Sequence, residues 1–170
     1  HGRPDEMCFY DFYLYPFVEV TLSSPSYSSC CFGSLEAQET LIFPHPLTVP
    51  PELVTIDQFA FITLYNLALS THISAVVNNQ FLRRQLQKAT DLWELVYSLQ
   101  WREELNLQPV HTLAILTNLG HALKILGKEA SSKVCYQNIL STLEFMRGRN
   151  EDVHYKSFFM YAAHRMLSTE

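Results

Sequence analysis

The chain has 170 residues, of which 48% are hydrophobic, 13% aromatic and only 17% charged. This length suits one domain with a real core, and the charged fraction lies below the usual quarter. Residues 1–52 hold seven acids against Arg3 alone, whereas the rest of the chain is nearly neutral. No basic stripe exists, so nucleic-acid binding is not expected. The shortage of charge leaves two interpretations open: a surface for a partner or another copy, and a compact aromatic-rich monomer.

The four cysteines form no metal-binding or redox motif. Cys8, Cys30, Cys31 and Cys135 contain no CxxC spacing. Because adjacent cysteines bridge each other only with strain, we expect free thiols, no metal, no cofactor and an intracellular, cytoplasmic protein. The chain starts at His1 rather than methionine, so it is interpreted as a fragment or a processed product whose targeting signal is not visible.

Residues 1–54 predict an extended N-terminal arm. Its aromatic and β-branched part around Pro16 predicts one or two short strands at most. Residues 22–34 are serine-rich and predict a loop. Residues 41–51 contain four prolines, which impose an extended backbone.

From Thr55 onward the pattern predicts an all-α domain over residues 55–170. Thr55 and Gln58 fit a capping box, Pro109 suits a first helical turn, and Gly127 suits a left-handed cap. Apolar residues at helical spacing predict five antiparallel helices, covering about 55–78, 81–101, 109–126, 129–147 and 151–167.

One stretch has the length of a membrane span, because residues 58–82 carry no charged side chain. Polar residues interrupt it at helical spacing, which is typical of a buried amphipathic helix rather than a lipid-facing one. We therefore expect no membrane span.

Two parts of the helical region repeat one order of residue types. Leucine, asparagine and a small residue are followed by a small residue and an aromatic, once through Leu116, Asn118, Leu119, Gly120, Ser132, Tyr136 and Ile139, and once through Leu64, Asn66, Leu67, Ala68, Ala89, Trp93 and Val96. This order resembles the tetratricopeptide repeat (TPR), in which a small residue on one helix accepts an aromatic from the returning helix. The resemblance covers residues 59–141, or up to 167 if the fifth helix caps the stack.

The resemblance implies a TPR-like right-handed stack. It assigns hairpin packing to small, leucine and aromatic residues, namely Leu64, Leu67, Ala68, Ala89, Trp93, Leu116, Leu119, Gly120, Gly127 and Tyr136. Ala68 lies 52 residues before Gly120, against about 34 in a standard repeat. The excess is assigned to the turn at 77–84 and the connection at 101–108. A plain antiparallel bundle is the alternative architecture.

The resemblance also implies that the first helix of each hairpin lines a concave, peptide-binding face. The expected partner-binding residues are Tyr65, Leu69, His72, Thr117, His121 and Lys124. Alternatively, the two histidines are ordinary helix-surface or core-edge residues, and Asn66 and Asn118 fix hairpin packing by bonding neighbouring backbone. A chaperone-type carboxylate clamp is not expected, because Tyr65 and Leu69 stand where it needs polar or basic groups.

No motif predicts catalysis, since the chain lacks a phosphate loop, a nucleophile elbow and an HExxH helix. Cys135 on an apolar stripe is interpreted as a core residue. We therefore expect a non-enzymatic scaffold that binds a protein or peptide. One variant has the aromatic arm 9–17 filling the concave face in cis. The alternative function is a structural subunit that uses its low-charge surface in a homo-oligomer or larger complex.

Overall fold

The computed structural model describes residues 41–48, 55–78, 82–102, 105, 107–148 and 156–168. Within these residues the chain is all-α, as predicted, and contains no strand. Its five helices are α1 (Ile56–Asn78), α2 (Leu82–Leu99), α3 (Pro109–Ile125), α4 (Glu129–Gly148) and α5 (Lys156–Leu167). The predicted limits of the first four helices are correct within two residues. The expected strands, the serine-rich loop and the start of the fifth helix lie outside the described residues.

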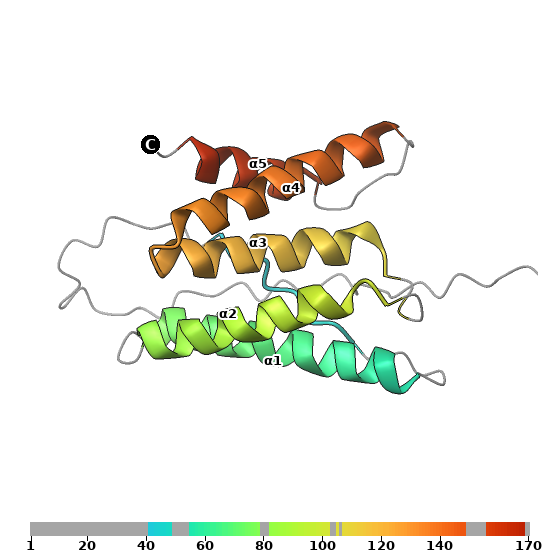
Figure 1. Cartoon of the computed structure of the whole chain (residues 1–170), viewed down its shortest axis with the longest axis vertical. Helices are drawn as coiled ribbons and strands as arrows, with labels where there is room; N and C mark the ends of the chain where they lie inside the picture. The colour runs from blue at the N-terminus through green and yellow to red at the C-terminus, as the bar shows by residue number, and fades with distance from the viewer. Residues whose placement is uncertain are drawn as a thin grey trace, which may run out of the picture.

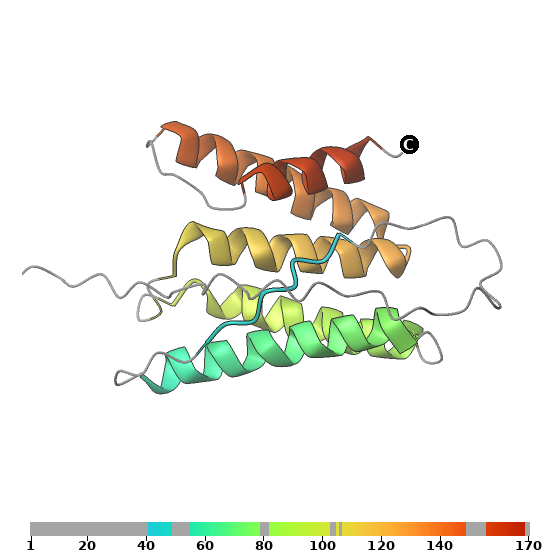
Figure 2. The same cartoon turned by 180° about the vertical axis from the view of Figure 1, so that it is seen from behind.

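Successive helices run antiparallel and form two layers. Helices α1, α3 and α5 form the layer seen in front in Figure 2, and α2 and α4 form the layer in front in Figure 1. Each helix packs on the next one along the chain, and α3 also contacts α5. Helix α3 is the centre of the core, since every residue from Leu113 to Leu123 is buried.

Local backbone chemistry explains where the helices begin and end. The Thr55 N–H donates to Gln58 Oε1 at 3.0 Å and the Gln58 N–H donates to Thr55 Oγ1 at 3.2 Å, which confirms the capping box. Gly127 has a φ of 77°, and the N–H groups of Gly127 and Lys128 bond the carbonyls of Lys124 and Leu123. These two bonds form a Schellman motif, so the predicted left-handed cap is confirmed.

A small residue meets an aromatic one inside the second hairpin. A Cβ added to Gly120 would lie 3.0 Å from the ring of Tyr136, and Ser132 Oγ donates to the Gly120 carbonyl at 2.8 Å. In the first hairpin Ala68 and Trp93 are fully buried in the same core. A side chain at position 120 would therefore press on the Tyr136 ring and on the Cβ of Cys135, 3.2 Å away, so glycine suits the close approach of α3 and α4.

The other expected packing residues divide into two groups. Most are buried or partly buried in the core, namely Leu64, Ala89, Leu116 and Leu119. Leu67 is instead 49% exposed, although it corresponds in sequence to the buried Leu119. Helix α1 is the end helix of the described stack, so its outer side has no helix to pack against, whereas α3 is covered on both sides.

The extra residues of the first hairpin are helical. Helix α1 ends at Asn78 and α2 begins at Leu82, so the two ends of the expected turn at 77–84 are helical, while residues 79–81 lie outside the described residues. Helix α1 continues for ten residues beyond Ala68, whereas α3 continues for five beyond Gly120. Longer helices bury more apolar surface and satisfy their own backbone groups, which a longer loop does not.

Candidate functional site

Residues 41–48 form an extended segment that crosses the layer of α1, α3 and α5 (Figure 2). Its side chains alternate in burial. From Phe43 onward every second residue is at least partly buried, with Phe43 and Leu47 buried and His45 partly buried, while Pro44, Pro46 and Thr48 are exposed. Leu41 is buried and Ile42 is partly buried against the core. A period of two is the geometry of an extended backbone. We call the helix surface under this segment the segment-binding face.

Asn118 of α3 holds the main chain of the segment at Phe43. Its Oδ1 accepts the Phe43 N–H at 2.7 Å, and its Nδ2 donates to the Phe43 carbonyl at 3.2 Å. The Asn118 side chain is fully buried. One side-chain amide thus satisfies both main-chain groups of one residue, as a neighbouring β-strand would.

Asn66 of α1 makes the same pair of bonds with Leu47, four residues further along the segment. Its Oδ1 accepts the Leu47 N–H at 2.8 Å, and its Nδ2 donates to the Leu47 carbonyl at 2.7 Å. Phe43 and Leu47 are about 13 Å apart in an extended chain, which is more than the distance of about 8–10 Å between the axes of directly packed helices. The asparagines occupy corresponding positions, each two residues before the small residue of its hairpin. They bond the backbone of the segment, not that of the hairpins.

Phe43 extends the segment-binding face to α5. Its ring lies 5.1 Å from the ring of Phe159 and 5.7 Å from that of Phe158, measured between centroids. The centroid of the His45 ring lies 4.7 Å from that of Phe43. The segment therefore contacts all three helices of the layer and runs from α5 towards α1, opposite to the order of the helices in the chain.

Most of the expected partner-binding side chains are buried. Lys124 is partly buried, and Tyr65, Leu69, His72, Thr117 and His121 lie in the interior. Tyr65 meets the ring of Trp93 edge-on, and Thr117 Oγ1 donates to the carbonyl of Leu113. The expected exposure of these five side chains is not observed, because they lie where α1 and α3 pack against their neighbours.

His72 and His121 nevertheless come together. His72 Nε2 lies 3.0 Å from His121 Nδ1, in a buried hydrogen bond between α1 and α3. Burial, with a contribution from the neighbouring imidazole, lowers the pKa of His72 to about 3. Burial, with a contribution from Lys124, lowers the pKa of His121 to about 4. Both rings are therefore neutral at pH 7 and join the two helices through one neutral hydrogen bond.

The described residues offer no further reactive cluster. Among them, no three histidine, cysteine or acidic side chains gather as metal ligands would. Cys135 is buried, and this burial raises the pKa of its thiol to about 11. The thiol is therefore protonated at neutral pH and packs as an apolar group.

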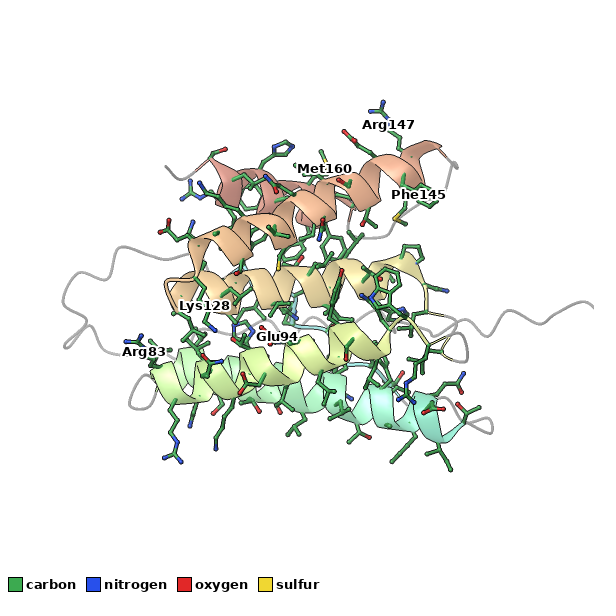
Figure 3. The ribbon with its side chains drawn as sticks, in the orientation of Figure 1. Arg83, Glu94, Lys128, Phe145, Arg147 and Met160 are labelled. Carbon is green, nitrogen blue, oxygen red and sulfur yellow. The ribbon has the colours of Figure 1, made fainter. Side chains whose placement is uncertain are left out.

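The outer side of α1 is the other unusual surface. Its exposed residues carry no charge, and the large apolar ones are Ile56, Phe59, Leu67 and Val77. By length and composition alone, Ile56–Val77 would suffice to cross a membrane. Its opposite side contributes Phe61 and Tyr65 to the core, however, and core helices have the same composition. The layer of α2 and α4 differs, because charged residues such as Arg83, Glu94 and Arg147 project from it (Figure 3).

Sequence reasoning missed the residues that build the segment-binding face. The sequence pattern assigns Asn66 and Asn118 only to hairpin packing. It gives no role to Phe43, Leu47 or Phe159. The sequence carries two signals: an asparagine at the same place in both hairpins, and the large apolar residues Leu41, Phe43 and Leu47 at odd-numbered positions of an extended, proline-containing stretch. The aromatic stretch 9–17, expected to fill the concave face in cis, lies outside the described residues.

Compared with known proteins, the chain matches no family model, no curated protein and no solved structure.

Proposed function

We propose that the chain is a non-enzymatic protein-interaction module, a TPR-like helical repeat whose segment-binding face holds an extended polypeptide. One observation carries the proposal: Asn66 and Asn118 each bond both main-chain groups of a single residue in segment 41–48. Main-chain groups are common to all peptides, so a segment of another protein offers the same donors and acceptors. The matching places of Asn66 before Ala68 and Asn118 before Gly120 support the TPR-like interpretation.

In this proposal residues 41–48 are the resident occupant of the face. A tethered segment competes at an effective concentration on the order of millimolar. A partner must therefore bind more tightly than the chain's own segment or meet the chain when that segment is released. The segment has an autoinhibitory role towards the partner and a structural role in the free chain, because Phe43 and Leu47 belong to the core.

The experiment tests peptide binding in trans. A labelled peptide of residues 39–50 is titrated into the variant Phe43→Ala/Leu47→Ala, whose own segment is weakened, and binding is followed by fluorescence anisotropy. We expect saturable binding that falls at least about 30-fold when Asn118→Ala is added, because two buried hydrogen bonds are lost. Asn138→Ala, an exposed asparagine on α4, is the matched control and should leave binding unchanged. Absence of binding to the folded variant contradicts the proposal.

The uncharged outer side of α1 favours a second candidate function, a structural subunit that self-associates through Phe59 and Leu67. Apolar surface of this kind is stabilised by burial against another chain. Sedimentation equilibrium over a hundredfold range of concentration should show a dimer that Phe59→Lys/Leu67→Lys converts to a monomer. A strict monomer at every concentration would exclude this candidate while leaving the peptide-binding proposal intact.

A further inference from the structure

We infer that segment 41–48 is a template for the partner, and that the face selects an uncharged extended segment of another protein with phenylalanine and leucine four residues apart and proline at outward positions between them. The pattern is apolar-x-Phe-Pro-x-Pro-Leu, as in residues 41–47. This inference rests on the proposed function and adds the chemistry of the partner.

The two asparagines fix the register of the bound segment. Phe43 and Leu47 are the residues whose main chains are bonded, and their side chains are also buried in the core. A shift by one residue would turn every inward side chain outward. A ligand can therefore satisfy both amides and fill both apolar positions only if its two large apolar residues are four apart.

The inward positions provide the selectivity. Phe43 is only 2% exposed and contacts the rings of Phe159 and Phe158 on α5 and the ring of His45. Truncating a phenylalanine in such surroundings typically costs about 3 kcal/mol or more, equivalent to more than about 100-fold in affinity. A charged residue at this position would be moved from water to a place against the aromatic rings of Phe158 and Phe159, which is costly, so an apolar residue is favoured.

The prolines suit the outward positions between the two bonded residues. Pro44 and Pro46 are exposed and have no N–H, while the N–H groups that the asparagines use belong to Phe43 and Leu47. Proline therefore removes no donor that the asparagines need. It also holds the free peptide near the bound, extended conformation, which reduces the entropy lost on binding.

Another protein is a better source of this segment than a second copy of the chain. In a second copy, residues 41–48 already lie on their own face and are tethered to it at an effective concentration on the order of millimolar. At micromolar protein concentrations, binding of the segment to its own face is therefore favoured over its binding to the face of another copy. The segment of another protein is not already bound to a face of its own chain, so it need not be released before it binds here.

The experiment compares peptides on the variant Phe43→Ala/Leu47→Ala. The native 39–50 peptide is measured against Phe43→Ala, against an alanine insertion between His45 and Pro46, and against Pro44→Ala/Pro46→Ala. We expect losses of more than about 100-fold for the first two, because an apolar contact or the register is lost. The double proline replacement should lose about 3- to 10-fold, since only preorganisation changes.

The outcomes separate the inference from the proposed function. If the Phe43→Ala and insertion peptides bind as tightly as the native one, the selectivity is wrong although the face still binds peptides. If no peptide binds the folded variant, the proposed function itself fails. Light scattering of the unmodified chain at micromolar concentration tests whether the bound segment comes from another protein or from a second copy. A dimer that dissociates in the Phe43→Ala variant would show that it comes from a second copy, which would contradict the inference of another protein as partner.

A second measurement covers the case in which the double variant does not fold. The unmodified chain is mixed with each peptide at concentrations above the millimolar effective concentration of the resident segment. Hydrogen exchange is followed at the Phe43 and Leu47 amides, which the two asparagines protect. The native peptide should accelerate exchange at both amides by displacing the resident segment. Equal acceleration by the Phe43→Ala peptide, or none by the native peptide, contradicts the inference.

Discussion

Two asparagines within mainly apolar helices determine what the segment-binding face can hold. A buried amide is costly unless both of its polar ends are bonded. Asn118 is fully buried and bonded at Oδ1 and Nδ2 to the same residue of the segment, Phe43. Leu116 and Leu119, close to it in sequence, are apolar core residues. Of these three side chains, only that of Asn118 can bond the main chain of the segment.

We predict that Asn118→Ala lowers the free energy of unfolding by about 2–4 kcal/mol, because the N–H and carbonyl of Phe43 lose their partner. Asn118→Asp should also be destabilising, because a carboxylate oxygen would then face the Phe43 carbonyl. Urea denaturation of the whole chain provides the measurement, with exposed Asn138→Ala as the control. Losses equal to that control, within about 0.5 kcal/mol, would show that the bonds to the segment do not stabilise the fold.

The two glycines of the second hairpin should respond differently to alanine. Gly127→Ala should cost about 1–2 kcal/mol through its left-handed backbone alone, because nothing lies within 4 Å of an added Cβ. Gly120→Ala should cost about 1–3 kcal/mol through overpacking against Tyr136. In a Tyr136→Leu background the Gly120→Ala loss should shrink while the Gly127→Ala loss is unchanged, as a double-mutant cycle by thermal denaturation would measure. Full additivity at Gly120 would contradict the assigned contact.

At the scale of elements, helix limits depend on residues close together in the sequence, whereas the position of an extended segment depends on residues far apart in the sequence. The capping box at Thr55 and the left-handed turn at Gly127 act within one or two helical turns, so the limits of α1 and α3 follow from short stretches of sequence. The position of segment 41–48 does not, because it depends on α1, α3 and α5 together. Four prolines between 44 and 51 predict an extended backbone but do not say where it lies.

We predict that the segment docks as one unit. Phe43→Ala should lower the free energy of unfolding by about 3 kcal/mol, and adding Leu47→Ala should cost less than Leu47→Ala alone, because the first change already weakens docking. Circular dichroism should still show the full helical signal, since no residue of the five helices is altered. Pro44→Ala, at an exposed neighbouring position, is the control. Strict additivity of the two losses would show that Phe43 and Leu47 pack independently.

At the scale of the whole molecule, buried neutral histidines make the stability depend on pH. Burial lowers the pKa of His72 to about 3 and those of His111 and His121 to about 4, against an ordinary value of 6.5. Above pH 6.5 folded and unfolded chains both carry neutral rings. As the pH falls below 6.5 only the unfolded chain binds these protons, so stability falls until the pH reaches the folded pKa values.

We therefore predict a loss on the order of 2 kcal/mol for each buried histidine between pH 7 and pH 5. Urea denaturation at intervals of half a pH unit would measure it. Replacing His111 by glutamine should flatten the curve, and replacing the exposed His164 of α5 should not. A stability that stays constant between pH 7 and pH 5 would mean that these rings bind protons equally in the folded and the unfolded chain, so that burial does not lower their pKa.

The sequence by itself determined the all-α class, the limits of four helices, the Gly127 cap and the equivalence of Asn66 and Asn118. These follow from backbone capping, apolar periodicity and repeated residue order, all of which are visible in short stretches. Only the tertiary structure decided that Tyr65, His72 and His121 are buried, and that Asn118 bonds Phe43, 75 residues earlier in the chain. The physical reason is that burial and main-chain pairing depend on which elements lie side by side, and polar residues on an apolar helix are compatible with either a surface or a satisfied interior.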